Sequence, residues 1–147
     1  MVLCRCKMIG TNNVLNIRSS TAFRWAGQTG STRGFCNFSA VMFCWRVGAY
    51  LIMRSYRRAK VRSIEQIIKR FAPPSENNTE AYIDFVCAQT GYNRKFVPIA
   101  VEEVANILVA MMFMEMGISK KEREASWKAL PPAVTTLIYK FDLKFVK

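Results

Sequence analysis

Glu115 is the acidic side chain whose place in the sequence is least typical of a surface residue. On a helical projection it falls on the face of Leu108 and Met112, opposite Glu102 and Glu103. It also falls in the last turn of the expected helix, where the negative end of the helix dipole disfavours a carboxylate. Both effects predict a raised pKa. A carboxyl group that stays protonated near neutral pH is the general acid that glycoside hydrolysis needs.

Two structural explanations of Glu115 stay open beside the catalytic one. The carboxylate could pair with a buried arginine such as Arg18 or Arg46, or a frayed helix end could let it reach water. Glu115 is therefore a candidate general acid on the strength of its expected burial alone.

Glu76 and Asp84 are the candidates for the second carboxylate of such a reaction. Glu76 lies in a loop between two prolines and a helix start, and loops held by a rigid scaffold often carry function. Its alternative is a charge partner for the N-terminus of the next helix. Asp84 follows Glu80 by four positions, so two like charges would face each other on one helix and could share a proton. Pairing with nearby Lys and Arg is the alternative.

The chain has no histidine, and its five cysteines form no Cys-x-x-Cys pair. The missing histidine excludes Ser-His and Cys-His catalytic pairs. A zinc site is not expected either. We expect no metal and no cofactor, so carboxylates must carry any acid–base chemistry. The cysteines are Cys4, Cys6, Cys36, Cys44 and Cys87.

A second kind of site is indicated by charge. The 22 Lys and Arg against 10 acids give a net charge of +12, which attracts nucleic acid, phospholipid surfaces or the acidic groups of a cell wall. On a helix from residue 39 to 58, Arg46, Arg54 and Arg57 fall on one side with Tyr50, and Arg58 follows. These arginines are the candidate polyanion-binding residues. An ordinary solvated face is the alternative.

The elements that must position these residues are mainly helical. Ser39 is expected to cap the first long helix, and Ser63 with Gln66 forms a capping box for the second. Pro73 ends that helix, and a third runs from the Asn77–Thr79 region to Gly91. Further helices are expected from Pro98 to Gly117, from Ser119 to about residue 129, and from there towards Phe141.

The pattern predicts a mainly α, compact, single-domain bundle of five to six helices. Residues 1–37 form a loop-rich N-terminal segment, 38–117 the helical core and 118–147 a C-terminal helical extension. The stretch "GFCNF" favours one short strand or hairpin. No apolar stretch reaches the roughly 20 residues of a membrane span. No secretory signal is evident at the N-terminus, so synthesis in the bacterial cytoplasm is the expectation.

Three segments carry a resemblance to a known family. They are "NNVLNIR" with "RWAGQTG", then "RGFCNFS" to "RVGAYLIMRSY", then "SIEQIIKRFAPPSENNTEAYIDFV". Together, over about residues 12–117, they resemble small phage and prophage proteins of Bacteroides-type genomes that are labelled virion structural proteins. That family usually reads Asn-Asn-Pro-x-Asn-Ile-Arg, and here Val14 replaces the proline. It also carries Tyr-Gly before its hydrophobic-Arg-Ala motif, where this chain has Phe43 and Cys44.

The resemblance implies a role in the virion, at peptidoglycan during entry or lysis. The family tends to place a glutamate just before Ser-Gly or Asn-Gly, the position that Glu115 occupies before Met116 and Gly117. The first hypothesis is accordingly a lysozyme-like cleavage of peptidoglycan by Glu115 with Glu76 or Asp84. The residues expected to contact the glycan are Asn16, Arg18, Trp25 and Tyr82.

The second hypothesis is a non-enzymatic virion protein that binds other virion proteins, or nucleic acid through its basic helix face. Under either hypothesis the expected location is the virion, or the bacterial cytoplasm for a prophage-encoded copy. Membrane association through the basic helix is a weaker third hypothesis, because its apolar and basic residues do not segregate.

Overall fold

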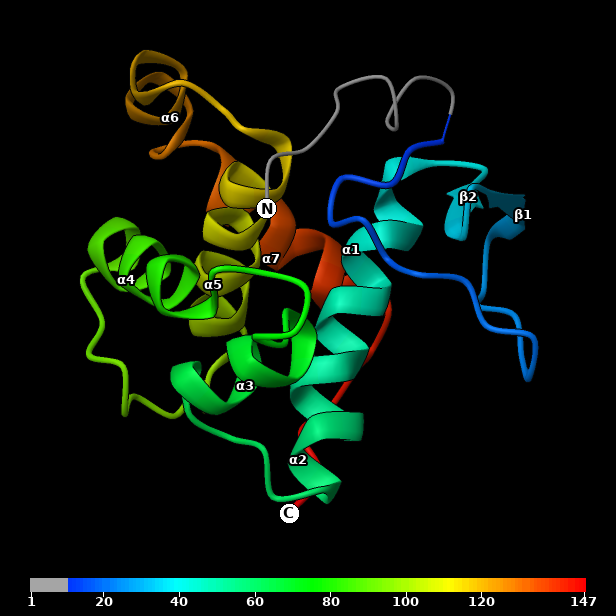
Figure 1. Cartoon of the computed structure of the whole chain (residues 1–147), viewed down its shortest axis with the longest axis horizontal. Coiled ribbons are helices and arrows are strands. Elements are labelled where there is room, and N and C mark those ends of the chain that lie inside the picture. Colours follow the sequence, from blue (N-terminus) through cyan, green and yellow to red (C-terminus); the bar gives the residue numbers. More distant parts are fainter. Residues whose placement is uncertain (1–10) are drawn as a thin grey trace.

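Helix α5 (Val101–Met116) is the central element of the molecule (Figure 1). A computed structural model describes residues 11–147, so Cys4 and Cys6 lie outside the described residues. Nearly all of α5 is buried, and α4 (Thr79–Thr90), α1 (Val41–Tyr50) and α7 (Leu130–Lys140) pack against it. A helix that is apolar over most of its length is expected to be covered by other helices, and α5 meets that expectation.

The remaining helices complete a bundle around α5. Helix α1 continues without a break through the π-helical segment η2 (Leu51–Ser55) into α2 (Tyr56–Arg58). Of the two shorter helices, α3 (Ile64–Phe71) packs against α4, and α6 (Lys120–Ser126) lies beyond the C-terminal end of α5 (Figure 1). If α1, η2 and α2 are taken as one helix, residues 11–147 contain six helices. The predicted mainly α bundle is confirmed.

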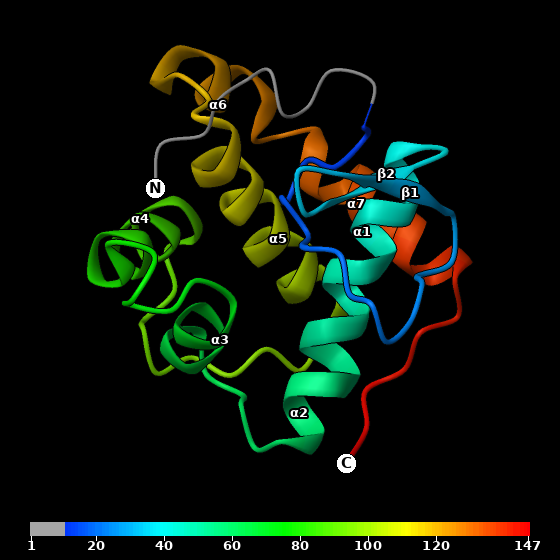
Figure 2. The same ribbon diagram turned by 45° about the vertical axis from the view of Figure 1, so that its right-hand side comes forward.

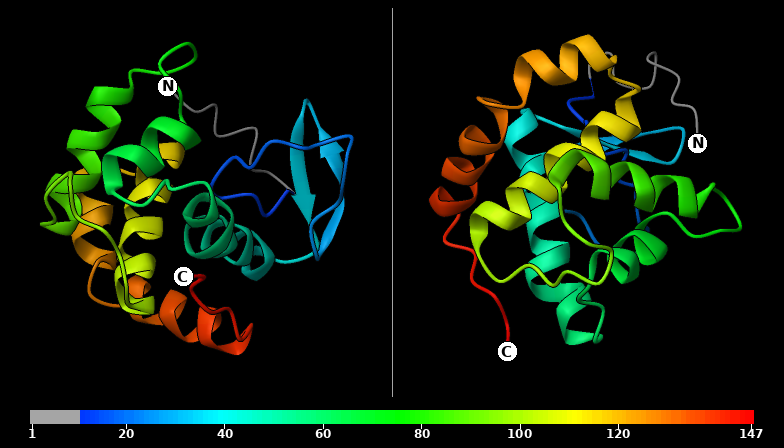
Figure 3. Two further views of the ribbon diagram at one scale, coloured as in Figure 1. Left: turned by 90° about the horizontal axis from the view of Figure 1, so that it is seen from below. Right: turned by 90° about the vertical axis from the view of Figure 1, so that its left-hand side faces the viewer.

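The predicted strand is part of a hairpin beside the helices (Figure 3, left). Strand β1 (Gln28–Thr32) pairs antiparallel with β2 (Phe35–Phe38), which is the "GFCNF" stretch. The turn residues Arg33 and Gly34 have φ angles of 54° and 83°, as a two-residue turn between strands requires. Strand β1 is polar and has no alternation of apolar and polar residues, so only its backbone pairing with β2 identifies it as a strand.

Several helix ends follow the predicted signals. The Ser63 hydroxyl accepts from Gln66 N at 3.3 Å, and the Gln66 side chain accepts from Ser63 N at 3.1 Å, which is the predicted capping box. Gly91 and Gly117 end α4 and α5 in the left-handed conformation, at φ 78° and 61°. Asn78 caps α4.

Two predicted helix starts are wrong. Helix α1 begins at Val41 after Ala40, and Ser39 makes no cap; its N–H donates to Gly27 O at 2.9 Å and so ties the helix start to the hairpin. Helix α5 begins three residues after Pro98, because the Glu103 carboxylate accepts from the free N–H groups of Ile99 and Ala100. The Glu103 side chain therefore caps α5, whereas the sequence had suggested that the helix begins at Pro98.

Gly48 allows α1 to pack closely on α5. A Cβ atom added there would lie 2.6 Å from Leu108 Cδ2 and 2.8 Å from Leu15 Cδ1, shorter than carbon atoms can approach. The absence of a side chain therefore lets the N-terminal loop and α5 share the same face of α1.

The C-terminal segment returns along the outer side of the first helix (Figure 2). Arg54 Nη1 donates to Lys144 O at 3.1 Å, and Arg57 Nε donates to Val146 O at 2.9 Å. Val146 N donates in turn to Met53 O at 3.1 Å. This C-terminal segment, residues 141–147, is thus held by η2 and α2.

Glu65 anchors α3 to the loop before α5, and this pairing predicts a pH dependence of stability. Hydrogen bonds from Lys95 and then Arg94, whose Nε lies 2.7 Å from Glu65 Oε2, hold the pKa of Glu65 below its ordinary 4.5. Because the pKa is lowered by folding, the pairing stabilises the protein above the ordinary value and is lost as the pH falls through the folded value.

We therefore expect Glu65→Gln to lower the unfolding temperature at about pH 7 and to have progressively less effect as the pH falls below 4.5. Thermal unfolding followed by circular dichroism across that range measures the difference. Asp84→Asn, an exposed carboxylate on α4, is the control. An equal effect of Glu65→Gln at both ends of the range would contradict the assignment.

Candidate active site

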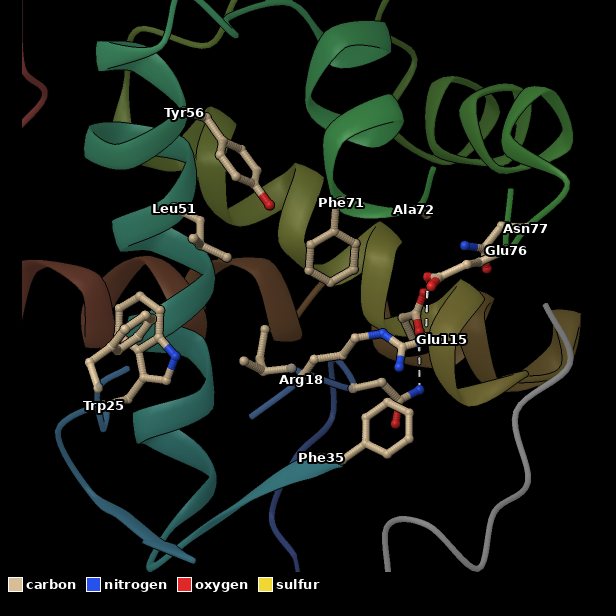
Figure 4. A pocket seen from close by; sticks show the side chains of 13 residues that line it. Arg18, Trp25, Phe35, Leu51, Tyr56, Phe71, Ala72, Glu76, Asn77 and Glu115 are labelled. Carbon is tan, nitrogen blue, oxygen red and sulfur yellow. Dashed lines mark hydrogen bonds and ion pairs between the residues drawn. The ribbon is translucent and has the colours of Figure 1, made fainter. Parts of the chain in front are cut away.

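A cavity of about 200 Å³ lies between the N-terminal loop, the η2 segment, the loop after α3 and the end of α5 (Figure 4). Acidic and aromatic side chains share its wall. The lining residues are Asn16, Ile17, Arg18, Phe23, Trp25, Phe35, Leu51, Tyr56, Phe71, Ala72, Glu76, Asn77 and Glu115.

Glu115 contributes a buried carboxyl group to this cavity. Its residue is 5% exposed and lies in the last turn of α5. Two hydrogen bonds fix the helix end: Gly117 N donates to Met114 O at 3.3 Å, and Ile118 N donates to Phe113 O at 3.0 Å. This pair of bonds is typical of a helix that ends at a glycine. The burial predicted from the helical projection is found, and frayed exposure to water is excluded.

Among residues 11–147, the polar side chains that contact the Glu115 carboxyl group include Asn16 and Tyr82. Asn16 Nδ2 donates to Glu115 Oε1 at 3.0 Å, and Asn16 is 8% exposed with a left-handed φ of 52°. Burial first, and then the charge of Glu115 and a side-chain hydrogen bond with it, raise the pKa of Tyr82 well above its ordinary value. Tyr82 therefore keeps its proton beside Glu115 at physiological pH.

Asn13 holds the loop that carries Asn16. Its Nδ2 donates to Ile17 O at 3.0 Å and to Cys36 O at 2.9 Å, and its Oδ1 accepts from Ile17 N at 2.8 Å. Asn13 is 2% exposed, so its amide bonds, inside the protein, backbone groups of the loop and of β2 that would otherwise lack these partners. The left-handed turn at Asn16 is thereby held against α5.

Glu76 and Arg18 lie together at the open side of the cavity (Figure 4). Arg18 Nη2 is 3.3 Å from Glu76 Oε2, and the two side chains are 57% and 48% exposed. The Arg18 guanidinium also lies over the Phe35 ring, 5.2 Å from its centroid. The structure thus places two carboxyl groups on one cavity, one buried and one solvated with a cation beside it.

Trp25 lies at the opposite end of the cavity from the two glutamates (Figure 4). Its ring meets Phe23 edge-on at 5.1 Å and Tyr50 at 5.7 Å between centroids. Trp25 N donates to Gln28 Oε1 at 3.0 Å, which fixes the loop to β1. Aromatic surfaces of this kind are suited to stacking on sugar rings.

Two of the sequence candidates lie away from the cavity wall. Asp84 is exposed on α4, and its expected partner Glu80 pairs with Arg94 Nη2 at 2.9 Å. Tyr82 is 1% exposed and contacts the Glu115 carboxyl from within the core. Asn16 lines the cavity, and its amide is engaged by Glu115.

The predicted basic stripe is largely occupied by the C-terminal segment. Arg46 lies over the Phe141 ring at 5.9 Å, and Arg57 lies over Phe145 at 5.1 Å. Arg54 and Arg57 donate to carbonyls of the same segment, whereas Arg58 is exposed. Three of these four guanidinium groups therefore help to hold the chain's own C-terminal segment.

The sequence did not single out Leu51, Tyr56 and Phe71 as cavity residues. Leu51 and Tyr56 share the cavity because of the π-helical turn between them, for which the sequence carries no periodic signal. Phe71 was assigned only to the buried side of α3, and it lies at the helix end where the chain turns into the Glu76 loop.

Metal ligands are not grouped in the described part of the chain. Residues 11–147 contain no cluster of three or more His, Cys, Asp or Glu side chains able to hold an ion. Within the same residues no helix is long and apolar enough to cross a bilayer.

Comparison with known proteins identifies a relative from a bacterial virus. No family model matches the chain. A 110-residue alignment, 34% identical, covers 72% of this chain and 68% of Protein P5 of Pseudoalteromonas phage PM2. The phage part of the sequence-based resemblance is confirmed, while its Bacteroides-type and peptidoglycan parts stay predictions. The chain belongs to the family of phage PM2 Protein P5.

Proposed function

We propose that the protein is a virion-associated phage protein that cleaves glycosidic bonds of bacterial peptidoglycan, with Glu115 as general acid. The observation that carries the proposal is the buried Glu115 carboxyl group on the wall of a cavity that also holds Trp25 and Glu76. A shielded acid, a solvated carboxylate and an aromatic surface are the parts that glycoside cleavage requires.

In this proposal Glu115 donates its proton to the glycosidic oxygen as the bond to the sugar breaks. The Glu115 side chain is shielded from bulk water and lies at the carbonyl end of α5. Asn16 Nδ2, 3.0 Å from Oε1, and the Tyr82 hydroxyl hold the carboxyl group in one orientation. Proton transfer depends on such fixed geometry.

Glu76 is the proposed second carboxylate, in preference to Asp84. The breaking bond leaves positive charge on the sugar ring, and an ionised carboxylate nearby stabilises that charge or activates water. Glu76 lines the same cavity as Glu115, is half exposed, and has Arg18 Nη2 3.3 Å from its Oε2. Asp84 is exposed on α4 and does not line the cavity.

The proposal is tested with purified peptidoglycan from several bacterial sources. We expect the wild-type protein to release soluble muropeptides whose mass spectra show cleavage between sugars, with either a reducing or an anhydro end. Heat-denatured protein is the control. Release of free peptides or of amino groups alone, or no release from any source, would overturn the glycosidase proposal.

Exchanging the second carboxylate discriminates between the two candidates. Glu76→Gln is expected to lower the rate of muropeptide release by on the order of 10²-fold, because it removes the second carboxylate of the proposed reaction. Asp84→Asn is expected to leave the rate unchanged. Initial rates on the same peptidoglycan compare the two variants, and the reverse ranking would reassign the role to Asp84.

A further inference from the structure

We propose that Tyr56 is a specificity-determining residue that recognises the acetamido group of a bound sugar. In this proposal its hydroxyl donates to the acetamido carbonyl oxygen, and Leu51 and Phe71 contact the acetamido methyl. The inference rests on the proposed function, in that the cavity is taken to bind a glycan. It adds a residue and a chemical group that decide which glycan binds.

The Tyr56 side chain is buried and faces the cavity. It is 8% exposed, and Figure 4 shows its hydroxyl pointing toward the space beside Leu51 and Phe71. Within residues 11–147 the hydroxyl forms no hydrogen bond, and the ring's polar neighbour is the Arg70 guanidinium, 5.8 Å from the ring centroid. The hydroxyl therefore opens onto the cavity, where it is available to bond a ligand.

The π-helical segment places Tyr56 on the cavity. Tyr56 N donates to Leu51 O, a bond that spans five residues, so about one turn separates the two side chains. In a regular α-helix, positions five apart differ by about 140° around the axis, and one of the two would point away. The π-helical segment therefore places Leu51 and Tyr56 on the same wall of the cavity.

The chemistry of the wall selects a neutral group with an acceptor and a methyl. Burial raises the pKa of Tyr56 to about 12, with the Arg70 charge opposing, so the hydroxyl remains a donor at physiological pH. A donor of this kind pairs with an acceptor oxygen, and Leu51 and Phe71 beside it are apolar. An acetamido group offers a carbonyl oxygen and a methyl together, whereas a plain sugar hydroxyl lacks the methyl. Peptidoglycan sugars carry this group.

Binding measured without turnover tests the assignment. The probes are chitotriose, which carries acetamido groups, and cellotriose, which has hydroxyls at those positions, and titration calorimetry on Glu115→Gln gives each dissociation constant. We expect chitotriose to bind at least about tenfold more tightly than cellotriose. Adding Tyr56→Phe is expected to weaken chitotriose binding about three- to tenfold and to leave cellotriose binding unchanged.

Tyr139→Phe is the matched control, because it removes the same atom from a tyrosine whose hydroxyl donates to Glu102 at 2.9 Å outside the cavity. The inference would be overturned if Tyr56→Phe bound chitotriose as tightly as its parent, or if it lost equal affinity for both sugars. It would also be overturned if the parent bound the two sugars equally or bound neither. Selective binding that depends on Tyr56, without muropeptide release by the wild type, would overturn the proposed function and leave the subsite standing. If the wild type released muropeptides but Tyr56→Phe left chitotriose binding unchanged, the proposed function would stand and the Tyr56 subsite would be overturned.

Discussion

Replacing Glu115 with glutamine is expected to lower the rate of muropeptide release by 10²- to 10⁴-fold, the usual contribution of a general acid. Glutamine keeps the shape of the side chain and an oxygen that can accept from Asn16 Nδ2, so the fold should be preserved. It has no acidic proton to give to the leaving oxygen. Initial rates from muropeptide analysis measure the effect, and circular dichroism checks the fold.

Glu122→Gln is the matched control, because it makes the same chemical change on the exposed surface of α6. We expect its rate to equal that of the wild type. If Glu115→Gln released muropeptides at the wild-type rate, Glu115 would be a structural residue and the general acid would have to be sought elsewhere.

Replacing Asn13 with alanine is expected to destabilise the protein by about 2–4 kcal/mol. The change leaves Ile17 N and Cys36 O without their buried partner, whereas Ile17 O keeps its bond from Cys36 N at 2.9 Å. Each unsatisfied group costs about 1–3 kcal/mol, with partial relief by relaxation. Urea unfolding followed by tryptophan fluorescence measures the free energy of unfolding.

Asn37→Ala is the comparison for that variant, since Asn37 Nδ2 makes an exposed bond to Thr32 Oγ1 at 2.9 Å. A loss below about 1 kcal/mol is expected there. Equal losses in the two variants would show that Asn13 is not the residue that holds the N-terminal loop. Asn13→Ala should also slow muropeptide release, because the loop that it holds carries Asn16 to Glu115.

The helices were predictable because their signals are local. Ser63 with Gln66, Gly91 and Gly117 act within one turn of a helix end, and a single sequence shows such residues directly. Strand β1 was not predicted, because it has no apolar alternation and exists through its pairing with β2. The π-helical turn was missed for a related reason: it has no periodic signal of its own, and its Met53 O accepts from Val146 N, far along the chain.

The cavity was predictable in part. Glu115 was found from the helical projection, since the apolar face of α5 is continuous in sequence. Its Asn16 partner comes from a loop residue with positive φ, and no helical or strand period connects the two. The stripe of Arg46, Arg54 and Arg57 was predicted as a binding face, because the sequence does not show that residues 141–147 return to cover it.

The hydrogen bond between Asn16 and Glu115 joins residues 99 positions apart. The two parts of the cavity wall that they form are therefore synthesised at very different times. A nascent chain on the ribosome carries the Asn16 loop long before α5 has left the exit tunnel. Until then Glu115 has neither its burial nor its partner. The assembled site therefore requires synthesis to have passed α5, and truncated translation products that end before α5 carry Glu76 without Glu115.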